Sequence, residues 1–265
     1  MIVCRSKAEI DTLRRVNQLV AQILAELRQM VVPGARTRDI DAAAEAMVLA
    51  EGAVPAFKGY HGYPATVCAS INEQVVHGIP SARRLAEGDI LSLDMGAKLD
   101  GFFGDCAVTI PVGKVSDDAA RLLRVTEEAL FHGIEAVRPG ARVSDIGVAV
   151  QRHVEAHGFS VVREFVGHGI GTALHEEPQI ANYGPGGRGP RLAEGMVLAI
   201  EPMVNFGGAG VKVLGDGWTA VTRDGSLSAH FEHTVVVTAD ACEILTLLDR
   251  DRGRARELMS VTVRS

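Results

Sequence analysis

Apolar residues recur at helical spacing near the start of the chain. Ser6 and Glu9 have the spacing of a capping box, and the apolar positions over residues 10–27 then repeat every three or four residues. A Pro-Gly pair at 33–34 ends the run. The pattern predicts one long amphipathic helix.

Three more helices are predicted by similar signals. We expect Thr37 to cap a second helix and Gly52 to end it. Ser116 begins a third helix that runs towards a second Pro-Gly pair at 139–140, and residues 144–158 supply its partner. The helices therefore come in two pairs.

Strand-like segments follow each helix pair. They are bounded by turn residues and are rich in apolar positions. In the first half they cover residues 65–77, 89–95 and 103–111, and in the second half residues 160–168, 174–181, 196–203, 211–222 and 230–238. Each half is thus two helices followed by strands, which predicts an α+β fold.

Two internal echoes indicate that the halves are related. Leu-Ala-Glu-Gly occurs in the segment that ends at Asp94 and again in the segment that ends at Glu201. Pro-Gly-Ala-Arg likewise occurs twice, at residue 33 and at residue 139. We expect a duplicated domain whose halves pack about an approximate two-fold axis, which would bring the two matching carboxylates together. The expected halves are residues 8–112 and 113–247 of a single domain over 1–265, with a charged, fraying tail over 249–265.

Composition and charge narrow the class of protein. The chain has 265 residues, 47% of them hydrophobic, which is ample for a sizeable core. Its net charge of -6 gives no electrostatic reason to expect a nucleic-acid or membrane partner. The four cysteines form no CxxC pair, and neither a signal peptide nor an apolar run of membrane-spanning length is present. We expect reduced thiols and a cytoplasmic protein.

Acidic residues at strand positions are the first sign of chemistry. A four-residue loop over 98–101 would set Asp94 directly opposite Asp105 in a hairpin, with Cβ atoms ~5 Å apart, where like charges destabilise a sheet. Apolar neighbours predict burial, so a cation must compensate. Glu201 and Glu232 occupy comparable strand positions. Four carboxylates are expected to converge.

Histidines extend this set. A tight turn near residue 171 would bring His175 back beside His168. His77 is followed by Gly-Ile, as is His168, which indicates another internal match, although His175 could equally be the repeat partner of His77. Three others are expected to be ordinary surface or packing residues: His153, His157 and His230.

The predicted ligands favour a metal centre. Four carboxylates and one imidazole can neutralise two divalent ions, and hard ligands of this kind favour Mn, Fe(II) or Co. Two ions ~3.5–4 Å apart can activate a bridging water, so hydrolysis is the natural reaction. An acid/base carboxylate pair of the glycosidase type would leave two of the acids unexplained. Nucleotide binding is not indicated, because no phosphate-binding loop motif occurs.

These residues resemble the metal-ligand pattern of the type I methionine aminopeptidases, in their compact bacterial form, over roughly residues 8–247. The matching motifs are Leu-Asp-Met-Gly, Gly-Asp-Cys-Ala, Gly-His-Gly-Ile-Gly, Ile-Glu-Pro-Met and Phe-Glu-His-Thr. The resemblance implies the pita-bread fold, in which a curved antiparallel sheet is backed by two helix pairs. It also implies the metal ligands Asp94, Asp105, His168, Glu201 and Glu232, with Asp105 and Glu232 bridging two ions.

The same resemblance assigns residues to catalysis and to substrate binding. His77 and His175 would contact the substrate amide and the tetrahedral intermediate, and Glu201 would shuttle a proton. Phe57 and Leu174 depart from the family pattern, in which a small residue or Cys and an aromatic residue are common. The substrate-binding residues implied are Phe57, Tyr60, His61, Tyr63, Cys68, His77, Leu174, His175 and Trp218.

The activity implied is removal of the initiator methionine from new proteins whose second residue is small. Two divalent ions with a bridging hydroxide would perform the hydrolysis. The expected partners are N-termini of nascent chains, with a possible contact to the ribosome near the exit tunnel, and a monomeric state. An Xaa-Pro peptidase of the same fold and a non-catalytic binding protein remain alternatives.

Overall fold

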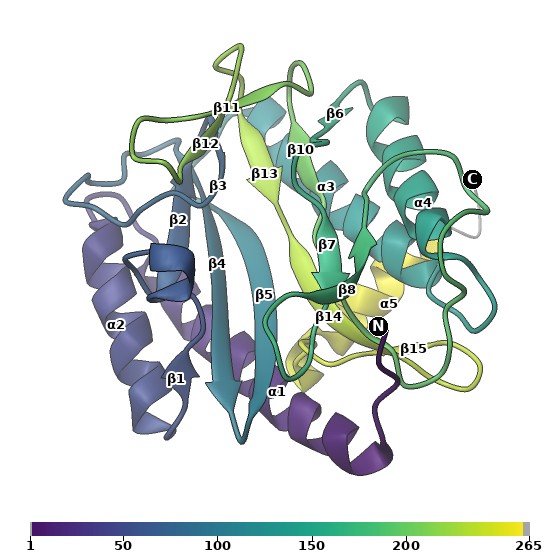
Figure 1. The fold of residues 1–265 in the computed structure, drawn as a ribbon. Helices are drawn as coiled ribbons and strands as arrows, with labels where there is room; N and C mark the ends of the chain where they lie inside the picture. The colour runs from purple at the N-terminus through teal and green to yellow at the C-terminus, as the bar shows by residue number, and fades with distance from the viewer. Residues whose placement is uncertain (1, 262–265) are drawn as a thin grey trace.

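A curved antiparallel sheet with helices along one face forms the body of the molecule (Figure 1). The computed structural model describes residues 2–261. The α-helices are α1 (Lys7–Leu27), α2 (Thr37–Ala50), α3 (Asp117–Glu135), α4 (Val143–Ala156) and α5 (Arg252–Val261), with short 3-10 helices at Arg28–Met30, Tyr60–Gly62 and Asp249–Asp251.

Nine strands make up the main sheet. Their order is β1-β4-β5-β14-β9-β7-β8, with β2 also paired to β4 and β15 to β14. Two smaller three-stranded sheets have the orders β13-β10-β6 and β11-β12-β3. The strand bounds are β1 (Val54–Pro55), β2 (Val67–Ile71), β3 (Gln74–Val76), β4 (Ile90–Leu99), β5 (Phe102–Pro111), β6 (Ser160–Val161), β7 (Gly167–Gly169), β8 (Glu176–Ile180), β9 (Val197–Ile200), β10 (Met203–Asn205), β11 (Val211–Val213), β12 (Ala220–Thr222), β13 (Ser228–His230), β14 (Glu232–Val237) and β15 (Cys242–Ile244).

The two faces of the main sheet have different roles. Leu93 and Met95 of β4 lie in one apolar cluster with Val16 and Val20 of α1, and β14 packs against α3 in the same way. Because side chains alternate along a strand, Asp94 points to the opposite face. The helices therefore bury one face and leave the other for polar chemistry. The predicted α+β class and the helix-backed antiparallel sheet are confirmed.

The helix starts were predicted correctly in two cases and missed by one residue in the other two. Ser6 forms the capping box and Ser116 accepts from the backbone of the third helix, as expected. Thr37 is the first residue of α2 and does not cap it. Its hydroxyl instead accepts from the Ser81 N–H at 2.9 Å. The Ser144 hydroxyl likewise bonds outside its helix, since it donates to the Arg188 carbonyl and accepts from the Arg188 N–H.

The predicted opposition of Asp94 and Asp105 is wrong by two residues. The β4–β5 hairpin closes with the two-residue turn 100–101, Asp-Gly, both with positive φ (50° and 86°). This is the backbone geometry that favours Asp-Gly in tight hairpins. The register therefore sets Asp105 opposite Gly96. The two acids are diagonal neighbours that still share one face of the sheet.

Matching contacts recur in the two predicted halves. Arg84 donates from Nη1 to the Gly34 carbonyl at 2.8 Å, and Arg191 donates from Nη1 to the Gly140 carbonyl at 2.8 Å. The same two arginines each form an isolated β-bridge with the residue that precedes α2 or α4. We propose on this basis that the two halves form one duplicated domain.

The end of the chain is helical in its described part. Residues 249–261, within the expected charged tail, form a short 3-10 helix and α5, while residues 262–265 lie outside the described part. Ala255 is 2% exposed, and Leu258 and Met259 pack beside it against the core, because spacings of three and four residues put them on one helix face. Within residues 2–261, none of the helices is both long and apolar enough to cross a membrane.

Candidate active site

Five predicted ligand residues come from five neighbouring strands or strand ends of the main sheet. Asp94 lies on β4, Asp105 on β5, Glu232 at the start of β14, and His168 on β7. Glu201 directly follows β9. The strand order β4-β5-β14-β9-β7 therefore lines them up across the sheet.

The register puts all five on the same face. Ala107 of β5 pairs with Asp94 on one side and with Glu232 on the other. His168 pairs with Ala199, two residues before Glu201. Residues that pair directly, and residues two apart on one strand, point to the same face of a sheet. The convergence predicted from the repeat is thus a consequence of strand pairing.

The ligand atoms lie close together in a buried setting. His168 Nε2 is 3.5 Å from Glu201 Oε1 and 3.9 Å from Asp105 Oδ2. Atoms of Asp105, His168 and Glu232 all lie within 4.8 Å of one another. Asp105 and Glu232 are only 3% and 2% exposed. Such proximity of buried carboxylates requires protons or cations to balance the charge.

Burial makes the charged form of each of these acids unfavourable. Burial, followed by the neighbouring carboxylates, raises the pKa of Asp105, Glu201 and Glu232 well above the ordinary range. Burial also raises the pKa of Asp94 to about 7. One buried oxygen on each of Asp94, Asp105 and Glu232 has no hydrogen-bond partner within the described residues. Acceptor-only oxygens that face one another without donors fit divalent cations.

His168 is held in the form that a metal ligand needs. Its Nδ1 donates to the Gly169 carbonyl at 2.9 Å, which leaves the Nε2 lone pair facing the carboxylates. Burial, and then His175, lowers the pKa of His168 to about 4, so the ring is neutral at neutral pH. A Cβ on Gly167 would clash with the Ala199 carbonyl, so glycine lets β7 approach β9 this closely.

The tight turn that was expected to return His175 to His168 is present. The two rings are T-shaped with centroids 4.4 Å apart, and His175 directly precedes β8. The Tyr60 hydroxyl lies 2.7 Å from His175 Nδ1. His77 stands at the same cavity, edge-on to Trp218 at 6.2 Å. His77 and His175 therefore line the same cavity as the carboxylates.

An apolar cavity of about 280 Å³ opens beside these acids. Tyr63 and Trp218 meet edge to face at 5.2 Å on its wall. Phe57 and Leu174, the two departures from the family pattern, also line it. The structure gathers every site residue predicted from the sequence around this cavity, namely Phe57, Tyr60, His61, Tyr63, Cys68, His77, Asp94, Asp105, His168, Leu174, His175, Glu201, Trp218 and Glu232, and adds Val76.

His230 belongs to the site but was predicted to be an ordinary residue. It is 1% exposed, its Nε2 lies 3.7 Å from Glu201 Oε2, and neither ring nitrogen has a hydrogen-bond partner among the described residues. Burial lowers its pKa to about 3. A signal was available, because His230 lies two residues before Glu232 in a strand-like segment.

Known proteins are similar to this chain in sequence and in fold. The model of metallopeptidase family M24 matches residues 11–239. A Bacillus subtilis protein named methionine aminopeptidase 1 is 52% identical over 93% of this chain and 99% of its own length. The methionine aminopeptidase of Clostridium perfringens is 50% identical over 94% of this chain and all of its own length.

Solved structures give the same picture. A methionine aminopeptidase from Thermotoga maritima matches 94% of this chain and 100% of its own, with a TM-score of 0.92 and 46% identity. A prolidase from Pyrococcus horikoshii shares the fold, with a TM-score of 0.77 and 21% identity over 94% of this chain and 65% of its own. The extent of the sequence match, together with a ligand set suited to divalent cations, shows that the chain belongs to metallopeptidase family M24.

Proposed function

We propose that this protein removes the initiator methionine from the N-termini of nascent proteins whose second residue is small. The observation that carries the proposal is the position of five metal-ligand side chains at the edge of an apolar, aromatic-lined cavity. A cavity of this kind can hold one unbranched thioether side chain while the scissile carbonyl reaches the acids. The identity of about 50% to methionine aminopeptidases over nearly the whole chain supports the same activity.

The proposed metal centre holds two divalent ions of the Mn, Fe(II) or Co type. Asp94 would bind one ion, His168 and Glu201 the other, and Asp105 and Glu232 would bridge them. When bound, the ions supply Lewis-acid activation of water and of the scissile carbonyl. Support comes from the buried carboxylate oxygens that lack hydrogen-bond donors, since four acids and one imidazole balance more than one divalent charge.

The remaining steps fall to side chains of the protein. Glu201 would accept the proton of the attacking water and pass it to the leaving amine, because its carboxylate lies at the cavity, 3.5 Å from His168 Nε2. If Tyr60 donates to Nδ1, the His175 ring keeps its proton on Nε2 and donates a hydrogen bond from there to the developing oxyanion. His77, whose pKa burial lowers to about 4, is neutral and orients the substrate amide.

The methionine side chain is proposed to occupy the apolar end of the cavity. Tyr63 and Trp218 present ring edges and faces there, which contact sulfur favourably. Cys68 lies at the base as a neutral thiol, because burial raises its pKa well above the ordinary value. His61 and Tyr60 stand at the exposed rim, where the chain beyond the first residue would leave the cavity.

Metal-stripped protein incubated with equal Met-Ala-Ser, Leu-Ala-Ser and Ala-Pro-Ala, with and without Mn(II) or Co(II), tests the proposal. Mass spectrometry should detect metal-dependent release of methionine alone. Release of alanine from Ala-Pro-Ala would instead assign the protein to the proline-specific peptidases that share its fold. Metal binding without turnover of any of these peptides would make it a binding protein.

The setting of the reaction is part of the proposal. Initiator methionine is present on newly made chains, so we propose that the protein acts in the cytoplasm as a monomer and meets its substrates near the ribosomal exit tunnel. Four free cysteines agree with a reducing compartment. Co-sedimentation with ribosomes carrying a stalled nascent chain tests the contact, and light scattering tests the monomer.

A further inference from the structure

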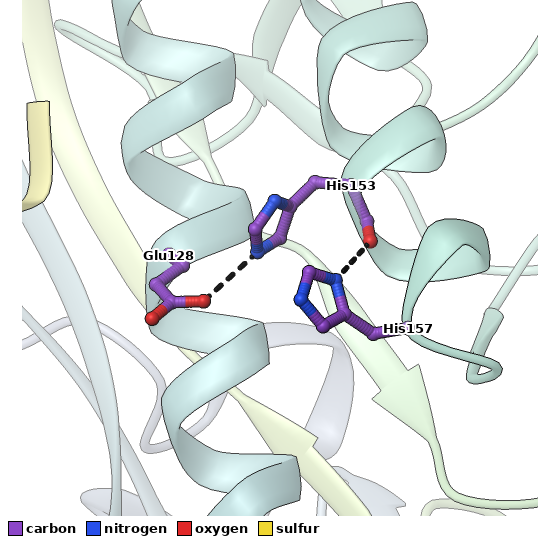
Figure 2. Close-up of side chains that lie close together, drawn as sticks. All are labelled: Glu128, His153 and His157. Carbon is purple, nitrogen blue, oxygen red and sulfur yellow. Dashed lines mark hydrogen bonds and ion pairs between the residues drawn. The ribbon is translucent and has the colours of Figure 1, made fainter. Parts of the chain in front are cut away.

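A second group of metal-ligating side chains lies between two helices. Glu128 comes from α3, His153 comes from the last turn of α4, and His157 directly follows the end of α4 (Figure 2). One ligand atom from each residue lies within 4.8 Å of the other two. Both helices pack on the face of the sheet opposite to the carboxylates, so the sheet separates this group from the active site.

Helical spacing explains why the side chains converge. His153 and His157 are four residues apart across the C-terminal end of α4, so their side chains lie on the same side of that end. Glu128 and His132 have the same spacing on α3, and the ring of His132 lies 4.3 Å from that of His153, centroid to centroid. The close packing of α3 against α4 brings these two faces together.

The imidazoles are oriented as metal ligands usually are. His157 Nδ1 donates to the His153 carbonyl at 2.8 Å, which fixes the tautomer and leaves the Nε2 lone pair free (Figure 2). His153 Nε2 lies 3.0 Å from Glu128 Oε2.

Access and charge also suit an ion. The side chains of Glu128 and His153 are 18% and 15% exposed, so an ion can enter from solvent. Arg124 pairs with Glu128 Oε1 at 3.3 Å and leaves Oε2 for the site. A simple hydrogen bond between Glu128 and His153 would explain the positions of those two side chains. It would not explain why His157 Nε2, which has no hydrogen-bond partner among residues 2–261, lies beside them.

We propose that Glu128, His153 and His157 bind a divalent transition-metal ion, with Zn(II) the best fit. Two imidazoles and one carboxylate, with a fourth position open to water, form a ligand set that zinc accepts readily. The ion would cross-link α3 to α4 and stabilise that half of the molecule, without taking part in peptide hydrolysis.

The test counts zinc at a site that is independent of the active site. In a D105N/E232Q background, which weakens the active-site ligand set, dialysis against Zn(II) followed by elemental analysis should give about one zinc ion per chain, the stoichiometry of one three-ligand site. Adding H157Q or E128Q should raise the Kd for zinc at least ~100-fold, more than the loss of an outer-shell partner causes. Both substitutions nearly preserve side-chain size, and either one suffices if the other fails to fold.

Controls separate the site from general charge effects. E155Q removes an exposed carboxylate from the same helix, where Glu155 accepts from Gln151, and should leave zinc binding unchanged. In the otherwise native chain, H157Q should retain peptidase activity with Mn(II). In the D105N/E232Q background, Zn(II) should raise the melting temperature, and adding H157Q should abolish that rise. Equal zinc content with and without H157Q and E128Q would overturn the proposal.

Discussion

Arg5 and Glu176 form a part-buried ion pair that joins the segment before α1 to the loop that carries His175. The Arg5 side chain is 5% exposed and that of Glu176 is 16% exposed. Glu176 also accepts from the backbone N–H groups of Thr172 and Ala173 at 2.8 and 3.0 Å. The pair therefore holds the turn that places His175 at the cavity.

Replacing Arg5 with methionine should reduce both stability and turnover. The change leaves the part-buried Glu176 carboxylate without its charged partner, which costs about 2 kcal/mol of unfolding free energy, the usual range for a hydrogen bond to a charged group. A loosened His175 should lower kcat for a methionyl peptide about tenfold and leave KM nearly unchanged, because the interaction is made in the transition state. Urea unfolding and steady-state kinetics measure the two effects.

The exposed pair of Lys58 and Glu45 is the matched control. Its nitrogen-oxygen distance is 2.6 Å, but the two side chains are 46% and 32% exposed. Lys58→Met should therefore change the unfolding free energy by less than about 1 kcal/mol. Equal losses of unfolding free energy in R5M and K58M would show that the lower exposure of the Arg5 pair does not make it more stabilising than the exposed pair.

Asp105→Asn should abolish activity and yet stabilise the metal-free protein. If Asp105 binds the metal ions as proposed, its loss should lower kcat/KM by at least about 1,000-fold, which corresponds to about 4 kcal/mol of transition-state stabilisation. Burial, and then Asp94 and Glu201, raises the pKa of Asp105. The folded metal-free chain thus binds a proton that the unfolded chain releases above about pH 4, and its stability falls as pH rises. The amide does not titrate, so its advantage should be larger at pH 8 than at pH 5.

Asp100→Asn is the control for this change. Asp100 lies in the turn of the same hairpin, 55% exposed and paired with Arg15, and asparagine also tolerates its positive φ of 50°. Its substitution should leave kcat/KM and thermal unfolding in chelator almost unchanged. Full activity in D105N would remove Asp105 from the ligand set.

Local signals were sufficient to predict much of the site. The repeated Leu-Ala-Glu-Gly segments lead to Asp94 and Glu201, and the apolar residues that flank each acid indicate a buried strand, as β4 and β9 are. The hairpin register was less accessible, because it depends on turn length. The Asp-Gly pair at 100–101 was the available signal, and a two-residue turn built on it shifts the pairing by two positions.

Contacts between distant segments could not be predicted in this way. His153 and His157 show their common helix face in the sequence, but Glu128 joins them only through the packing of α3 on α4. The Arg5 pair likewise spans 171 residues of sequence and reflects no local pattern. Such contacts follow from tertiary packing, which periodicity and capping rules do not encode.

Leu174→Ala should widen the cavity and weaken selectivity for methionine. Leu174 is 2% exposed and lines the cavity, where its side chain would exclude branched groups. Removing it should raise the ratio of kcat/KM for Leu-Ala-Ser to that for Met-Ala-Ser about tenfold, which is within the range for small changes in an apolar pocket. The two peptides are compared by mass spectrometry in one reaction.

Leu13→Ala provides the matched control for that variant. Leu13 lies in the same apolar cluster but does not line the cavity. Both variants should lose about 2–5 kcal/mol of stability, the usual cost of Leu→Ala in a core. Only L174A should change selectivity. A similar change in L13A would mean that general loosening, and not the cavity wall, sets the preference.

His153 should make the metal-free protein less stable in mild acid. An unfolded histidine titrates near pH 6.5, whereas burial, and then His132, lowers the pKa of His153 to about 4 despite the opposing hydrogen bond that Glu128 accepts from its ring. Between these values the unfolded chain binds a proton that the folded chain does not, so the stability is complete above pH 6.5 and is lost as pH falls towards 4. In EDTA, the loss between pH 6.5 and 4.5 should be about 1 kcal/mol larger for the native chain than for H153Q, because partial exposure moderates the linkage. Parallel stability curves would show that the ring of His153 is protonated as readily in the folded chain as in the unfolded one.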